Sequence, residues 1–135
     1  MAKNIFLNLP VKDIEKTNAF FTHLGFGFNP QFSSEQATCM VVTDNIFVML
    51  LHESFFGGFT KKPIADAHGS TEMLIGLDAE NRDAVDTMIA KAIEAGGTHT
   101  VAVQDHGWMY SHGFADLDGH QWEVFWMDPA GPPAA

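Results

Sequence analysis

A single carboxylate within an apolar strand is the feature of this chain that most calls for a chemical explanation. Residues 116–127, DLDGHQWEVFWM, predict a turn at Asp118 and Gly119 and then a strand. Because side chains alternate along a strand, Trp122 lies on one face and Glu123 on the other. A carboxylate that is buried without a partner is costly, so we expect the surroundings of Glu123 to use its charge.

Three roles suit Glu123. A metal ligand needs further donors nearby, whereas a structural carboxylate is satisfied by the backbone, by Tyr110 or by ordered water. A general base or ligand anchor works without a metal, and desolvation by Phe6, Met49 and Leu74 would make Glu123 a better base. If this third role is correct, we expect Glu123→Gln to abolish turnover or weaken binding while the fold stays intact.

Two histidines and a second glutamate, Glu72, are the further candidate metal ligands. His52 lies near the end of an expected strand, and His112 lies on the strand that pairs with the strand of Glu123. If Ser111 shares the face of Glu123, His112 faces the other way. Catalytic metals usually take three protein ligands, and these four residues form no evident triad. The sequence therefore disfavours a divalent metal site and predicts no cofactor.

Helical and strand patterns follow the same order in the two halves of the chain. The first half predicts a strand at residues 3–9 that ends at Pro10, a helix at 13–24, a strand at 26–32, and strands at 37–43 and 46–51. The second half predicts a strand at 72–77, a helix between Asn81 and Gly96, a strand at 98–103, a loop at 104–108, and strands at 109–115 and 121–127. This order is a βαβββ unit repeated at a period of roughly 70 residues.

Aligned residues support the repeat, because residues 6–9 correspond to 74–77 and residues 47–50 correspond to 121–124. If each helix covers one face of its sheet, the other two faces curl into one concave half-barrel, the cup, which receives Glu123. We therefore predict an α+β fold. Its expected parts are a single domain at residues 1–128, with modules at about 3–52 and 71–128 and a linker at about 53–70, and a tail at 129–135.

The linker is expected to contain a short helix near residues 62–67. Its aromatic side chains, Phe55, Phe56 and Phe59, either cover a pocket or pack on the core or on a second subunit. Packing is the more common outcome for such groups.

Three motifs make the chain similar to a known family. They are LPVKD at residues 9–13, HLGF at 23–26 and DLDGHQWE at 116–123. Together with the paired βαβββ units, these motifs resemble the vicinal oxygen chelate superfamily, also called the glyoxalase, bleomycin-resistance and extradiol-dioxygenase family. The resemblance covers about residues 3–128. It implies two modules in a curved mixed sheet with helices on the outer face, and a homodimer.

Members of this family with metal chemistry hold the ion with side chains from the first and last strands of both modules. By resemblance, those positions fall here on Phe6, Met49, Leu74 and Glu123. Only Glu123 keeps a hard donor, since the sulfur of Met49 prefers soft metals. The resemblance therefore implies the fold of the family with an incomplete metal site.

We predict a protein that binds a small organic ligand, aromatic or otherwise apolar, with one polar or cationic group for Glu123. The expected pocket residues are Phe6, Asn8, Met49, Leu51, Leu74, Trp108, Ser111, Glu123 and Phe125, with Phe56 near the mouth. An alternative is a metal-dependent lyase, isomerase or dioxygenase of the same superfamily that uses a displaced ligand set. A third hypothesis is a dimeric scaffold whose cup is filled by its own side chains.

Composition narrows the classes of partner. The chain has 7 Lys and Arg against 17 Asp and Glu, a formal charge of −10, which disfavours nucleic acid and anionic membranes. No apolar run approaches the roughly 20 residues of a membrane helix, and the N-terminus does not resemble a signal peptide. Cys39 is the single cysteine, so no intrachain disulfide is expected, and the cytoplasm is the expected compartment.

Overall fold

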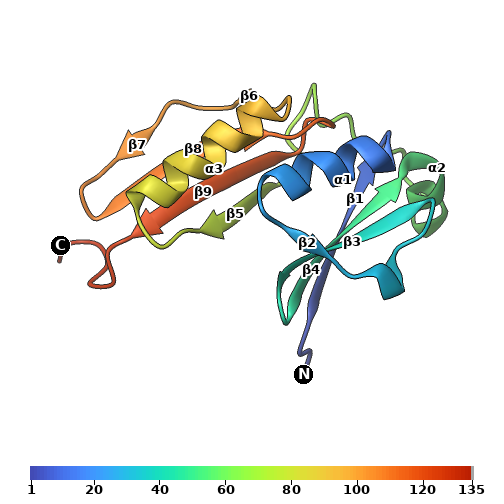
Figure 1. The fold of residues 1–135 in the computed structure, drawn as a ribbon, viewed down its shortest axis with the longest axis horizontal. Helices are drawn as coiled ribbons and strands as arrows, with labels where there is room; N and C mark the ends of the chain where they lie inside the picture. The colour runs from blue at the N-terminus through green and yellow to red at the C-terminus, as the bar shows by residue number, and fades with distance from the viewer. Residues whose placement is uncertain (135) are drawn as a thin grey trace. The chain divides into compact units, whose positions relative to one another are not determined.

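The computed structural model describes residues 1–134 and divides the chain into two compact units, Met1–Ala65 and Asp66–Ala135 (Figure 1). The first unit contains β1 (Ile5–Val11), α1 (Ile14–His23), β2 (Gly27–Phe28), the 3-10 helix η1 (Pro30–Phe32), β3 (Ala37–Thr43), β4 (Ile46–His52), α2 (Glu53–Phe56) and the 3-10 helix η2 (Gly57–Phe59). The second contains β5 (Leu74–Asp78), α3 (Arg82–Glu94), β6 (Thr98–His99), β7 (Gln104–Asp105), β8 (Met109–Ala115) and β9 (Gln121–Met127). This order confirms the predicted α+β class with two βαβββ-like modules.

Each unit builds its own mixed sheet. The strand order is β1-β4-β3-β2 in the first unit and β5-β9-β8-β6 in the second, where β7 also pairs with β8. Strands β1 and β4 are parallel, as are β5 and β9. The register pairs Asn8 with Met49 in the first sheet and Gly76 with Glu123 in the second. These pairs occupy corresponding positions in the predicted repeat alignment, so the register confirms the internal repeat.

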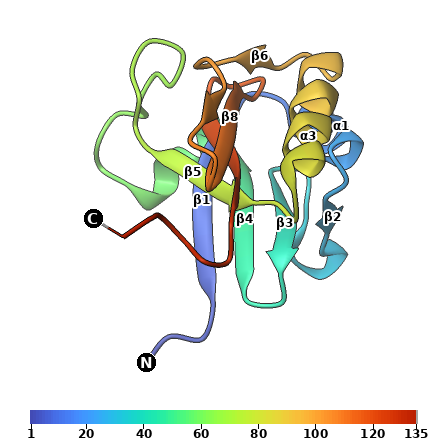
Figure 2. The same ribbon diagram turned by 90° about the vertical axis from the view of Figure 1, so that its left-hand side faces the viewer.

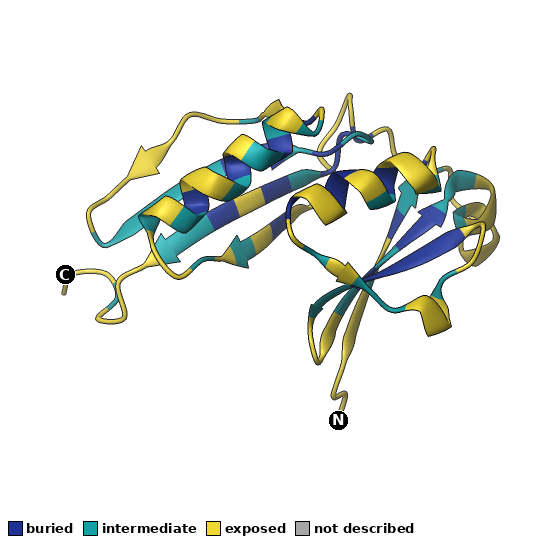
Figure 3. Ribbon diagram, viewed as in Figure 1, coloured by how far each residue is buried: buried dark blue, intermediate teal, exposed yellow. Residues whose placement is uncertain are grey.

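Both long helices begin at the predicted cap residue. The Asp13 side chain accepts a hydrogen bond from Lys16 N (3.0 Å), and the Asn81 side chain accepts one from Ala84 N (2.8 Å). After α3, Gly96 has a φ of 105°, a conformation that favours glycine at the end of a helix. Buried and exposed residues alternate around both helices, as amphipathic helices require (Figure 3). Among the helices of residues 1–134, none is long and apolar enough to cross a membrane.

A separate apolar core supports each sheet. In the first unit its buried side chains include Leu9, Val11, Phe20, Phe21, Val48 and Leu50. In the second unit they include Val85, Ile89, Ala92, Phe114, Trp122 and Val124. The rings of Phe114 and Trp122 stack with their centroids 6.2 Å apart. Trp122 therefore occupies the core face that alternation predicts, and Glu123 occupies the other face.

Two predicted strands of the first unit differ from the structure. Strand β1 does not end at Pro10 but continues to Val11, because β1 is an edge strand, where a proline is tolerated. The strand expected at residues 26–32 is confined to β2. It stops because Asn29 caps η1, its side chain accepting a hydrogen bond from Gln31 N (3.0 Å).

Two further segments also differ. Residues 62–67, which the structure describes, form no helix; the helical turns of the linker lie earlier, at α2 and η2. The strand expected at residues 98–103 is reduced to β6, and the expected loop after it contains β7. Residues 100–103 bulge between these two short strands, opposite only His112 and Gly113 of β8.

Candidate ligand site

The sheet of the second unit has one face that α3 does not cover, here called the open face. Figure 2 shows α3 beside β8 on one side of this sheet. The buried Trp122 belongs to the α3 side, so alternation places Glu123 and Phe125 on the open face. Ser111 of β8 pairs with Phe125 and shares this face, and Leu74 of β5 lies on it opposite Gln121. The sheet therefore brings together predicted site residues from three strands.

A cavity of about 360 Å³ lies on the open face of the second unit. Its walls come from β8, β9 and the segment before β8, and are formed by Val101, Gln104, Met109, Ser111, His112, Glu123, Phe125 and Met127. Three of the predicted pocket residues, Ser111, Glu123 and Phe125, thus line one cavity. Apolar and sulfur-containing side chains supply half of the lining residues, and Glu123 supplies the acidic group.

The Glu123 side chain is exposed. The reason lies in its cross-strand neighbours, Gly76 on β5 and Gly113 on β8, which carry no side chain to cover it. The predicted partner Tyr110 donates instead to Asp86 of α3 (2.7 Å). Within the described part of the chain, no group donates a hydrogen bond to the Glu123 carboxylate.

Other groups take the space beside the two glycines. A Cβ on Gly76 would lie 3.2 Å from Cε1 of Phe125, so the Phe125 ring leans across the sheet toward the position opposite Glu123. A Cβ on Gly113 would meet the hydroxyl oxygen of Thr100. An aromatic ring and a hydroxyl group therefore flank Glu123 on its two sides.

The turn before β9 fixes where Glu123 points. The carboxylate of the buried Asp116 accepts hydrogen bonds from Asp118 N, His120 N and Trp122 Nε1, each at 3.0 Å. Burial raises the pKa of Asp116, and these donors, together with the nearby His120, oppose the rise. Asp116 anchors both the turn and the indole of Trp122. It therefore fixes Trp122 on the core face, and alternation then places Glu123 on the open face.

An arginine holds one wall of the cavity. Arg82, at the start of α3, donates to both carboxylate oxygens of Asp105 (2.6 and 2.9 Å). Its guanidinium also lies 5.0 Å from the ring centroid of Tyr110 and 5.4 Å from that of Trp126. The hydrogen bonds from Arg82 and from the following turn lower the pKa of Asp105 to about 2. Asp105 directly follows Gln104, so the ion pair also fixes this lining residue.

His112 borders the cavity, but its ring lies on the α3 side, as alternation with Ser111 predicts. The ring stacks on that of His99 with the centroids 5.2 Å apart. Burial and the nearby His99 lower the pKa of His112, while Asp86 of α3 opposes this shift. The imidazole is therefore held on the other side of the strand from the Glu123 carboxylate.

The other two candidate metal ligands have structural partners. Glu72 Oε1 lies 2.8 Å from Nδ1 of the buried His120. His52 Nδ1 accepts a hydrogen bond from Ser54 N (3.2 Å) and caps α2. Throughout residues 1–134, no three His, Cys, Asp or Glu side chains are grouped closely enough to hold one ion.

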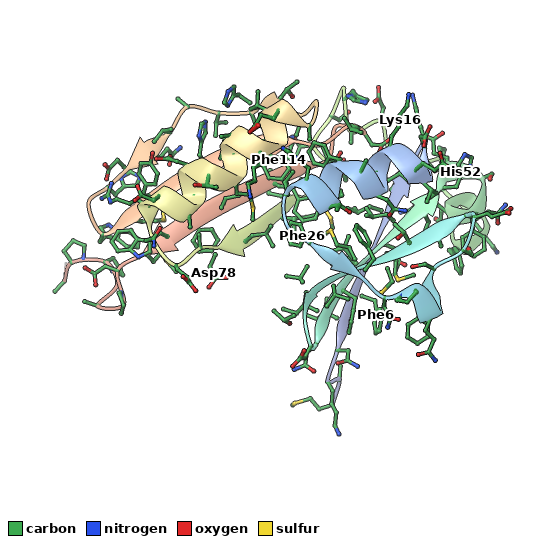
Figure 4. All side chains as sticks on the ribbon, in the orientation of Figure 1. Phe6, Lys16, Phe26, His52, Asp78 and Phe114 are labelled. Carbon is green, nitrogen blue, oxygen red and sulfur yellow. The ribbon has the colours of Figure 1, made fainter. Side chains whose placement is uncertain are left out.

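The remaining predicted pocket residues lie on the first sheet or at the edge of the second. Those of the first unit share one face of its sheet by register and are Phe6, Asn8, Met49 and Leu51. Phe6 is half exposed and stacks on Phe47 with the ring centroids 4.9 Å apart (Figure 4). Trp108 directly precedes β8, and its carbonyl accepts a hydrogen bond from Asp128 N (2.7 Å).

Besides His112, which was predicted only as a candidate metal ligand, four lining residues of the cavity were not among the predicted pocket residues. Two of them could have been found by alternation, since Met109 is two residues from Ser111 and Met127 is two residues from Phe125. Val101 and Gln104 could not, because they reach the cavity through the bulge between β6 and β7.

Part of the sequence matches a known protein family. Residues 3–43 match the family described as bleomycin resistance protein-like N-terminal. No curated protein matches the chain.

Solved structures share the fold of nearly the whole chain. The hypothetical protein SA1046 from S. aureus is 27% identical, with a TM-score of 0.79 over 93% of this chain and 94% of that chain. A glyoxalase-related enzyme from Fulvimarina pelagi is 19% identical, with a TM-score of 0.79 over 100% and 94% of the two chains. A glyoxalase/bleomycin resistance protein/dioxygenase family enzyme from Burkholderia phytofirmans PsJN is 18% identical, with a TM-score of 0.74 over 90% and 96%.

Proposed function

We propose that this chain is a member of the glyoxalase/bleomycin resistance/dioxygenase superfamily, also called the vicinal oxygen chelate superfamily, and that it binds a small, largely apolar or aromatic organic molecule. The observation that carries the proposal is the cavity in which Ser111, Glu123 and Phe125 meet. Its volume of about 360 Å³ falls in the range of small-molecule sites, roughly 300 to 1,000 Å³.

The lining suits a ligand with an apolar body and one polar group. Met109, Phe125 and Met127 offer polarizable and aromatic surface to the body. Gln104 and Ser111 can donate or accept hydrogen bonds, and Glu123 accepts them with a full negative charge. Glu123 therefore serves as the anchor that orients the ligand.

We propose that this binding needs no metal. A superfamily metal would have to be held by Glu123 together with other donors, but the ring of His112 lies on the α3 side, and Glu72 is engaged with His120. A single exposed carboxylate can anchor a ligand by hydrogen bonding and charge, and Glu123 of the second unit is such a carboxylate.

We extend the proposed site to residues beyond the cavity. Leu74 lies on the open face of the same sheet, and Trp108 adjoins the strand that carries Met109. Phe6, Asn8, Met49 and Leu51 occupy the corresponding face of the repeated sheet in the first unit. We propose that Leu74 and Trp108 add apolar contacts to the ligand and that the chain works as a homodimer. A role in ligand binding for the four residues of the first unit stays a prediction.

Fragment screening by NMR tests the proposed function. Amide shifts of uniformly labelled full-length protein are recorded with a set of small aromatic molecules, and the shifted residues are mapped. The proposal predicts saturable shifts centred on Ser111, Glu123 and Phe125. Shifts that cluster elsewhere, or no saturable shifts at millimolar fragment, would count against it.

A further inference from the structure

The surroundings of Glu123 restrict the kind of polar group that a ligand can present to it. The carboxylate is exposed, lines the cavity and receives no hydrogen bond from the described residues. The lining side chains include no Lys or Arg, and the chain as a whole has 17 acidic against 7 basic residues. A ligand with an anionic group would meet repulsion here, whereas a cationic group would supply the missing counter-charge.

Phe125 adds an aromatic surface beside this charge. Phe125 and Glu123 are two residues apart on β9, and the Phe125 ring leans toward Gly76, the residue opposite Glu123. A cation close to the carboxylate can at the same time contact this ring, whose π-electrons attract it. Asp78 pairs with Phe125 in the register of β5 and β9 and adds a second negative charge on the same face. This environment suits a weakly hydrated organic ammonium group.

Gly76 leaves room for the ring at that position. A methyl group at residue 76 would lie 3.2 Å from Cε1 of Phe125, closer than ordinary van der Waals contact. The ring would have to shift by a few tenths of an ångström away from residue 76, and so away from the position opposite Glu123. Gly76 is therefore a positioning residue that acts through Phe125.

We propose that the cavity selects an organic cation, namely a protonated or quaternary ammonium group on an apolar body, and that Gly76 sets this selectivity by keeping the Phe125 ring beside Glu123. This inference rests on the proposed ligand-binding function and names the class of ligand. The Glu123 carboxylate supplies the charge, and the Phe125 ring contacts the carbon atoms around the cationic nitrogen.

Three probes with one benzyl or phenyl body test the selectivity: benzyltrimethylammonium, benzyl alcohol and benzoate. Dissociation constants are measured from amide shifts of the cavity residues in the full chain. We expect the ammonium probe to bind roughly tenfold tighter than the alcohol, because it makes both a charge contact and a cation–π contact. We expect benzoate to bind weakest of the three.

Variants then test which residues produce the selectivity for the ammonium probe. Glu123→Gln and Phe125→Leu should each reduce the preference for the ammonium probe over the alcohol, and Gly76→Ala should reduce it by a smaller factor. Gly27→Ala is the matched control, because Gly27 also lies in a strand and its Cβ would meet nothing within 4 Å. A purely structural role for Gly76 would weaken both probes equally and leave the ratio unchanged.

The outcomes separate this inference from the proposed function. If the alcohol binds at the cavity as tightly as the ammonium probe, the selection of a cation is wrong while ligand binding stands. If the ratio is unchanged in Gly76→Ala, the role of Gly76 is wrong. If none of the three probes shifts the cavity amides, the selection of a cation fails, and the proposed binding site loses its support as well.

Discussion

The Glu123 carboxylate is exposed because two of its neighbours are glycines, which have no side chains. Gly76 and Gly113 stand on its two sides, so nothing directly opposite it neutralises the carboxylate. A metal site would need imidazole or carboxylate donors around such a group. Here the ring of Phe125 and the hydroxyl of Thr100 take the space beside the glycines. The residues directly opposite Glu123 therefore leave its charge uncompensated.

His112 makes the second unit sensitive to pH. Burial and the nearby His99 lower its pKa from the usual value near 6.5, so the folded state binds fewer protons than the unfolded state. The stability of the fold should therefore decrease as the pH falls through about 6.5 and below. In His112→Gln this dependence should weaken.

Urea unfolding of the wild type and His112→Gln at several pH values measures this effect. His106→Gln is the control, because His106 is an exposed histidine of the same unit. Equal pH dependence in His112→Gln and the wild type would show that His112 is not the group responsible.

At the scale of elements, the ion pair between α3 and β7 holds one wall of the cavity. Strand β7 has only two residues, too few to stay paired with β8 through backbone hydrogen bonds alone. Arg82 adds a two-point contact to Asp105 and stacks over two rings of the sheet. The position of Gln104 therefore depends on a side chain from the helix.

Arg82→Gln should release this segment. Hydrogen bonds from Arg82 stabilise the ionised form of Asp105 and hold its pKa at about 2, so in the variant the pKa should rise toward roughly 4. In the wild type the ion pair favours the folded state above the unfolded-state pKa, and this contribution is lost as the pH falls toward 2. A carboxyl-detected NMR titration of Asp105 measures the shift.

Arg82→Lys is the matched variant, because it keeps the charge but loses the planar two-point contact. We expect an intermediate pKa for Asp105 and faster amide exchange at Gln104. A pKa near 2 in Arg82→Gln would mean that another donor holds the Asp105 carboxylate.

Local signals explain which elements the sequence could predict. The caps at Asp13 and Asn81 depend on residues nearby in the sequence, and so does the alternation in β8 and β9. These helices and strands were therefore predicted within a few residues. The short strand β7 was not, because its pairing with β8 depends on a bulge and on Arg82, 23 residues away. For the same reason the face of Glu123 was predictable and its exposure was not.

At the scale of the whole molecule, the two units repeat one register with different chemistry. The pair Asn8 and Met49 of the first unit corresponds to Gly76 and Glu123 of the second. The first pair is neutral, so at these positions the duplication leaves a single charged side chain. The duplicated module therefore keeps its register while the side-chain chemistry of the equivalent positions differs.

Calorimetric titration of the tightest fragment tests the central claim that Glu123 anchors a ligand without a metal. Untagged full-length protein is titrated before and after treatment with a chelator, alongside Glu123→Gln and the control Glu80→Gln, which alters another exposed glutamate. We predict one site per chain, an affinity unchanged by the chelator and by Glu80→Gln, and a loss of roughly tenfold in Glu123→Gln. Binding that disappears with the chelator and returns with a divalent metal would contradict the account, as would full affinity in Glu123→Gln.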